Sequence, residues 1–199
     1  MTVVRTEQHR WLVPVANLLG QRYTSFSLSL RMAAALHGEW SIVETGSLRK
    51  AGNWEDGQST VIFARFAAQY GRVCHTVDTS VDALQVAKTA TKQWDRNMGY
   101  HNSTGVDWLL KTQMPIGLLY LDSLDAYGGG DPHHPTEETW HLAQEEQMHE
   151  LEAAWPSLIS GAIVLLDDHP AKTKYSINLL RSREAQCFVE GQQSGWRIQ

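Results

Sequence analysis

Five acidic side chains stand at the ends of short apolar runs, where they could hold a polar ligand or a cation. They are Glu44, Asp78, Asp122, Asp167 and Asp168. Each run is followed by a glycine-bearing or polar segment, as expected where a buried strand leaves a sheet. Ligands of open α/β sheets bind just outside the carboxyl ends of the strands. The acids are therefore predicted to face one shared crevice.

The stretch 41–78 predicts the unit that forms this crevice, because it reads as strand, glycine-bearing loop, helix and strand. Gly46 and Gly57 carry no Cβ, so the backbone can approach a ligand closely there. Ser59 opens the helix, whose free N–H groups suit a ligand carboxylate. Asp78 follows Gly57 by 21 residues, about where an acid accepts hydrogen bonds from ribose hydroxyls. A nucleotide-like ligand is expected.

The rest of the chain continues the alternation of strands and helices. Further strands are predicted over 99–103, 116–121 and 161–166, and a final hairpin over 185–198. The pattern predicts an α/β fold with an open, mostly parallel sheet, helices on both faces and an antiparallel hairpin at the end. We expect a single domain over 1–199, with N-terminal helices in 1–39 and the α/β core in 40–199.

The composition and net charge of the chain limit the kinds of partner that it is expected to bind. The chain has 199 residues, of which 42% are hydrophobic, and a net charge of −5. This charge argues against a nucleic-acid partner, because phosphate contacts need clustered Lys and Arg. No run of about 18 apolar residues is present, so no membrane partner is expected. The N-terminal sequence lacks a signal peptide's apolar core, which favours a cytoplasmic location. A homo-oligomer stays open.

The motifs together resemble those of class I S-adenosylmethionine-dependent methyltransferases, in particular the small metal-dependent O-methyltransferases of the catechol and macrocin types. The matching segments run from residue 40 to 198 and have the family's order. They are Glu44-Thr45-Gly46, Gly57-Gln58-Ser59, Asp78, Asn102-Ser103-Thr104-Gly105, Asp122 and Asp167-Asp168. The resemblance implies a Rossmann-like methyltransferase fold and methyl transfer to a hydroxyl of a small-molecule acceptor.

The resemblance also implies the residues that contact the cofactor, S-adenosylmethionine. They are Glu44, Gly46, Ser47, Gly57, Ser59, Asp78, Thr104 and Asp122. Here the residues between Ser47 and Gly57 form an inserted loop, which the catechol enzymes lack and the antibiotic-sugar branch shares.

A divalent cation is expected at Asp122, Asp167 and Asp168, as the resemblance implies. Mg²⁺ prefers hard oxygen ligands, and adjacent carboxylates repel each other unless a cation is present. The ion would orient the acceptor hydroxyl and lower its pKa. Asp122 and His169 are the predicted catalytic residues. No lysine follows Asp122 as it does in the catechol enzymes, so another residue must act as the general base. His169 is the first choice because it stands beside the two aspartates.

Other classes fit less well. Residues 52–59 are close to a P-loop, but the phosphate-binding lysine is missing and Glu55-Asp56 would repel phosphate, so we reject this reading. A nicotinamide dehydrogenase is disfavoured because G-x-G-x-x-G is absent. A hydroxylase-like protein or a non-catalytic binding protein on the same scaffold stays open as the alternative function.

Overall fold

The computed structural model describes residues 10–54, 58–123 and 136–199. One predicted site residue, Gly57, lies outside the described residues. Within them the chain forms a seven-stranded sheet in the order β3-β2-β1-β4-β5-β7-β6. The strands are β1 Ser41–Thr45, β2 Cys74–Asp78, β3 Met98–Asn102, β4 Ile116–Leu121, β5 Leu158–Leu166, β6 Gln186–Glu190 and β7 Ser194–Arg197. The first five strands pair in parallel, and β7 pairs antiparallel with both β5 and β6. The predicted sheet and closing hairpin are confirmed.

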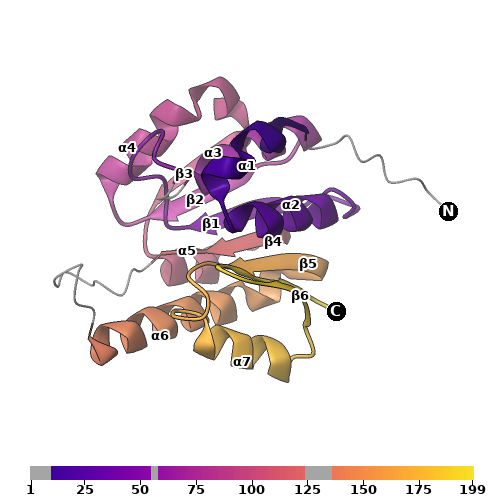
Figure 1. Cartoon of the computed structure of the whole chain (residues 1–199), viewed down its shortest axis with the longest axis vertical. Helices are drawn as coiled ribbons and strands as arrows, with labels where there is room; N and C mark the ends of the chain where they lie inside the picture. The colour runs from indigo at the N-terminus through magenta and orange to yellow at the C-terminus, as the bar shows by residue number, and fades with distance from the viewer. Residues whose placement is uncertain (1–9, 55–57, 124–135) are drawn as a thin grey trace.

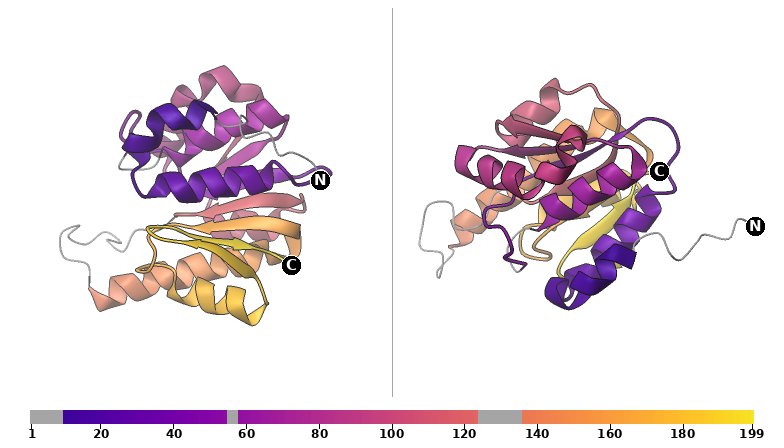
Figure 2. Two further views of the ribbon diagram at one scale, coloured as in Figure 1. Left: turned by 45° about the vertical axis from the view of Figure 1, so that its right-hand side comes forward. Right: turned by 90° about the horizontal axis from the view of Figure 1, so that it is seen from above.

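Helices connect the strands and cover both faces of the sheet (Figures 1 and 2). The α-helices are α1 Ala16–Leu19, α2 Arg22–Ala33, α3 Ser59–Tyr70, α4 Val81–Ala90, α5 Gly105–Lys111, α6 Glu137–Ala154 and α7 Lys174–Ser182. Short 3-10 helices span η1 Arg10–Val15, η2 Lys92–Asn97 and η3 Trp155–Ser157. Ser80, Thr104 and Thr136 cap α4, α5 and α6 by accepting a backbone N–H, which satisfies one of the free donors of each first turn.

Two apolar clusters hold the layers together. One cluster joins α2 and α3 to the sheet through Phe26, Phe63 and Tyr120. The other joins α5, α6 and α7 to the opposite face, where Leu119 and Leu121 point. Successive residues of a strand point to opposite faces, so β4 contributes to both clusters, and all six of its residues are buried. Helices η1, α1 and α2 contribute to the same core as the sheet.

Strand β5 begins at Leu158, three residues earlier than predicted. Gly161 interrupts its apolar pattern, and the pairing with β4 shifts register in this region. Gly161 has a φ of 82°, which glycine adopts easily, so the strand passes through this irregularity. Within the described parts of the chain, no helix is long and apolar enough to cross a membrane.

Candidate cofactor and catalytic site

The carboxyl ends of β1, β2 and β4 form the floor of the candidate site. Gly46 follows β1 with a φ of 80°, and a Cβ at this position would overlap the backbone carbonyl oxygen of Asp122. Only glycine permits the turn and the close approach together. The turn thus places Ser47 beside the end of β2 and Asp122 beside the end of β1.

Asp78 is presented to the crevice by hydrogen bonds from three groups. The backbone N–H of Ser47 donates to Asp78 Oδ2 at 2.8 Å, and the Ser47 hydroxyl donates to the same oxygen at 3.0 Å. The backbone N–H of Ser80 donates to Asp78 Oδ1 at 2.7 Å. Bonds of this kind to a charged acceptor are short and fix its orientation. Asp78 is therefore a pre-positioned acceptor at the strand end.

Two adjoining cavities of about 200 and 270 Å³ share Gly46, Asp78 and Ser123 in their walls. The first also contacts Ser47, Arg49, Ser59, Ser80, Ala83 and Asp122. The second contacts Val77, Thr79, Ser103, Thr104, Gly105 and Glu146. The structure thus brings together six predicted cofactor residues, namely Gly46, Ser47, Ser59, Asp78, Thr104 and Asp122.

Glu44 lies beneath these cavities rather than in their walls. Its side chain is fully buried, and Oε2 accepts a hydrogen bond from the Thr60 hydroxyl at 2.7 Å. Thr60 Oγ1 in turn accepts the backbone N–H of Leu48 at 3.1 Å. Burial raises the pKa of Glu44 to about 7, against the hydroxyl hydrogen bonds that lower it. In this arrangement Glu44 joins the end of β1 to the first turn of α3.

Asp122 and Asp168 are joined by a lysine. Nζ of Lys172 lies 2.9 Å from Asp122 Oδ1 and 2.8 Å from Asp168 Oδ2. Lys172 is almost completely buried, and it lies between β5 and α7. Burial raises the pKa of the Asp122 carboxyl, and the Lys172 ammonium works against that rise.

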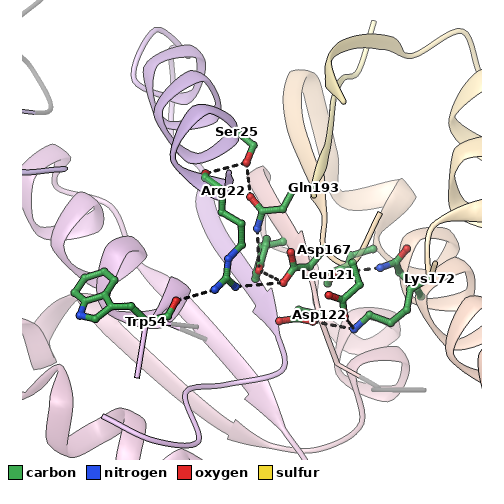
Figure 3. Close-up of polar contacts among 11 residues, drawn as sticks. Arg22, Ser25, Trp54, Leu121, Asp122, Asp167, Lys172 and Gln193 are labelled. Carbon is green, nitrogen blue, oxygen red and sulfur yellow. Dashed lines mark hydrogen bonds and ion pairs between the residues drawn. The ribbon is translucent and has the colours of Figure 1, made fainter. Parts of the chain in front are cut away.

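Asp167 points away from this ion pair. Its Oδ2 accepts the Tyr120 hydroxyl at 2.8 Å and lies 3.8 Å from Arg22 Nη1. Asp167 continues the alternation of β5 onto the face that holds Tyr120 and α2. Figure 3 shows Arg22 and Gln193 converging near Asp167 while Asp122 reaches toward Lys172.

The three acids predicted to share a metal ion therefore divide between two polar networks. Among the described residues, no group of three His, Cys, Asp or Glu side chains is arranged to hold a metal. The carboxylate oxygens of Asp122 and Asp168 that face each other are arranged around an ammonium group rather than around a divalent ion. The sequence hypothesis placed all three carboxylates at neighbouring strand ends, which is correct, but it did not anticipate that a lysine and an arginine would take their oxygens.

His169 lies in another hollow. It contacts a groove of about 870 Å³ between α6 and α7, together with Trp140, Lys174 and Arg181. Its Nδ1 is 2.7 Å from Thr173 Oγ1, and its backbone N–H donates to the carbonyl oxygen of Gln192 at 2.9 Å. His169 is not among the described residues that contact the two cavities beside Asp78. Its role as the general base stays a prediction.

Besides Arg22, two buried ionisable residues near the site were missed from the sequence, Lys172 and Glu150. Glu150 in α6 accepts the Thr45 hydroxyl at 2.9 Å, and a Cβ on Gly105 would overlap its Oε1. Burial raises the pKa of Glu150 to about 8. Neither residue has a sequence signal beyond its charge, since Glu150 stands among other helix acids and Lys172 precedes a helix start.

Comparison with known proteins defines the family. A family model described as a methyltransferase domain matches residues 52–169, which is more than half of the chain, so the chain belongs to this methyltransferase family. No curated protein sequence matches the chain significantly. The resemblance to class I methyltransferases is confirmed by this match and by the fold.

Solved structures with the same fold are only distantly related in sequence. The O-methyltransferase NovP superposes with a TM-score of 0.62 at 12% identity, covering 88% of this chain and 78% of NovP. CalS11, a TDP-rhamnose 3'-O-methyltransferase, gives 0.60 at 17% identity, covering 99% of this chain and 95% of CalS11. The N-methyltransferase NodS from Bradyrhizobium japonicum, solved with S-adenosyl-L-homocysteine, gives 0.54 at 13% identity, covering 88% and 86%. At these identities the likeness extends to the fold alone.

Proposed function

We propose that this chain transfers the methyl group of S-adenosylmethionine to a hydroxyl of a small molecule. The observation that carries the proposal is the carboxylate of Asp78, which Ser47 and Ser80 hold at the end of β2. A carboxylate in this place accepts hydrogen bonds from both hydroxyls of a ribose. NodS, which has the same fold, was solved with S-adenosyl-L-homocysteine.

The two adjoining cavities suit the two ends of this cofactor. The cavity beside Ser103, Thr104 and Gly105 is assigned to the adenine ring. The cavity beside Ser59 is assigned to the methionine end, because the first turn of α3 offers free N–H groups to its carboxylate. Asp78 contacts both cavities and would hold the ribose between them.

Methyl transfer at this site needs a base and an in-line approach. The acceptor O–H gives its proton to a base, for which Asp122 and His169 are the candidates. An oxygen lone pair then bonds to the methyl carbon, and the C–S bonding pair returns to sulfur, which becomes a neutral thioether. Asp122 borders the same cavity as Ser59, so its negative charge favours the cationic sulfonium there. Positioning supplies most of the acceleration.

A hydroxyl acceptor is proposed because two of the three structural neighbours compared above are O-methyltransferases. The N-methyltransferase NodS has the same fold, so the fold does not fix the acceptor atom. A small molecule is favoured over a nucleic acid by the net charge of −5. No step of the proposed transfer is assigned to a divalent ion, because Lys172 Nζ is paired with one carboxylate oxygen of Asp122 and one of Asp168.

The test is a methyl-transfer assay with methyl-labelled S-adenosylmethionine. Acceptors would include catechols and sugars, matched amines in which nitrogen replaces the hydroxyl, and an RNA pool. The proposal expects label in a hydroxyl-bearing small molecule together with one equivalent of S-adenosyl-L-homocysteine. Label found only in amines or in RNA would overturn the hydroxyl assignment. Formation of a hydroxylated product without methyl transfer would favour the hydroxylase-like alternative.

A further inference from the structure

Lys172 is a buried cation at the border of the site. Its side chain has a relative exposure of 1%, and its ammonium lies between the carboxylates of Asp122 and Asp168. The distances, 2.9 and 2.8 Å, are those of charge-assisted hydrogen bonds. In Figure 3 the ammonium end of Lys172 points at Asp122.

The buried ammonium is paired on two sides. A buried charged group loses its hydration, which is costly unless opposite charges stand beside it. Here the carboxylates of Asp122 and Asp168 both lie within hydrogen-bond distance of Lys172 Nζ. Lysine is almost never fully buried unless it is paired in this way. The ammonium therefore neutralises part of the acidic charge at the ends of β4 and β5.

A divalent ion would need the oxygens that this ammonium uses. Such an ion takes about six oxygen ligands at roughly 2.0–2.6 Å, which requires the carboxylates to converge on a single point. Here the point between Asp122 and Asp168 is filled by Nζ at hydrogen-bond distance. The third acid is engaged elsewhere, since Asp167 Oδ2 accepts from Tyr120. The other oxygen of Asp167, Oδ1, is buried without a hydrogen-bond partner among the described residues.

We propose that Lys172 is the resident cation of this site and takes the place of a divalent metal, so that methyl transfer here needs no added metal ion. The statement about methyl transfer rests on the proposed function. The statement that Lys172 stands in place of a divalent metal does not depend on that function. Lys172 acts as a positioning residue, because it holds Asp122 at the wall of the cavity that also contains Ser59 and Asp78.

The test is metal binding by the native protein and by variants of Lys172. Titration with Mn²⁺, followed by electron paramagnetic resonance, reports the bound ion without any cofactor or substrate. The native protein is expected to take up no ion at this site below about 10 mM, whereas dedicated oxygen sites saturate at roughly millimolar or less. Lys172→Met keeps a side chain of similar length and removes its charge. Asp122 and Asp168 then lose their ammonium partner, and they should bind Mn²⁺ at least about tenfold more tightly than in the native protein.

Two controls separate this gain from general charge effects. Lys172→Arg keeps the cation and should show no gain. Lys172→Met combined with Asp168→Asn removes one ligand and should abolish the gained site. A native protein that binds Mn²⁺ stoichiometrically, and loses it on Asp168→Asn, would overturn the proposal, because the ion would then use Asp168 in place of Lys172. If Lys172→Met does not fold, the native titration decides the point, together with methyl transfer measured in excess chelator. Transfer abolished by the chelator and restored by Mg²⁺ would overturn it.

The outcome is distinguishable from a failure of the proposed function. Binding of S-adenosyl-L-homocysteine is measured on the same samples by calorimetry. A native protein that binds neither Mn²⁺ nor the cofactor product contradicts the methyltransferase proposal while leaving Lys172 as the resident cation. A native protein that binds both contradicts the inference while leaving the proposed function intact.

Discussion

Ser47 and Asp78 are joined by two hydrogen bonds to one carboxylate oxygen, 2.8 Å from the Ser47 backbone N–H and 3.0 Å from its hydroxyl. The two residues lie 31 positions apart, at the ends of neighbouring parallel strands. The contact leaves the carboxylate fixed in the wall of both cavities before any ligand arrives. Such pre-organisation reduces the entropy lost when a ligand binds.

The first prediction concerns this carboxylate. Asp78→Ala removes charge-assisted hydrogen bonds worth about 1.5–3 kcal/mol each, so S-adenosyl-L-homocysteine should bind about 10- to 150-fold more weakly. Asp82→Ala, on the exposed side of α4, is the matched control and should bind normally. Isothermal titration calorimetry measures both. Equal affinity for the native protein and the Asp78 variant would show that this acid does not hold the ribose.

The second prediction concerns the turn after β1. Gly46→Ala and Gly52→Ala both place a side chain at a φ near 80°, at 80° and 78° respectively, which costs each about 1–2 kcal/mol. At Gly46 the new Cβ also meets the backbone of Asp122, whereas no described atom lies within 4 Å at Gly52. The free energy of unfolding should therefore fall by about 1–3 kcal/mol more for Gly46→Ala. Urea denaturation gives both values, and similar losses for the two variants would rule out the close approach at Asp122.

The third prediction concerns pH. Glu150 has a pKa of about 8 in the folded protein, against 4.5 for a free glutamate side chain. Between these values the folded state holds a proton that the unfolded state has lost. Stability is therefore highest below the lower value, and it falls as pH rises by up to about 1.4 kcal/mol per unit. Glu150→Gln stays neutral and should flatten this part of the profile.

Glu152→Gln, exposed on the same helix, provides the control for this pH effect. Urea unfolding at about pH 5, 6.5 and 8 gives the profile of each protein. Glu44, with a pKa of about 7, should leave a similar slope over a narrower pH range in every variant. A Glu150→Gln profile as steep as that of the native protein would assign the slope to other groups.

The fold could be predicted from the sequence because local patterns and topology agree. Strand β4 is a continuous apolar run, as strands covered on both faces are, and the capping residues of α4, α5 and α6 stand where the helices begin. Most of the predicted cofactor residues lie together around the two cavities, because Gly46, Ser47 and Asp78 stand at strand ends. Parallel strands bring such ends to a single edge of the sheet.

The partners of the acids could not be predicted, because they depend on side-chain direction and on long-range packing. Asp167 and Asp168 are adjacent in sequence, yet Asp168 has a φ of 52° and leaves the strand geometry, so the two carboxylates face different neighbours. Arg22 reaches Asp167 from α2, which lies far away along the chain. Lysines are usually exposed, so Lys172 carried no sign of burial. The partners of these acids are thus set by the tertiary structure rather than by the acidic motifs.

The most direct test of the central claim is calorimetric titration of the native protein with S-adenosyl-L-homocysteine, beside NAD and ATP at the same concentrations. We predict one site per chain for S-adenosyl-L-homocysteine, with a Kd in the micromolar range, equivalent to about −8 kcal/mol, and no saturable binding of NAD or ATP. Tight binding of NAD or ATP, with no heat from S-adenosyl-L-homocysteine, would contradict it.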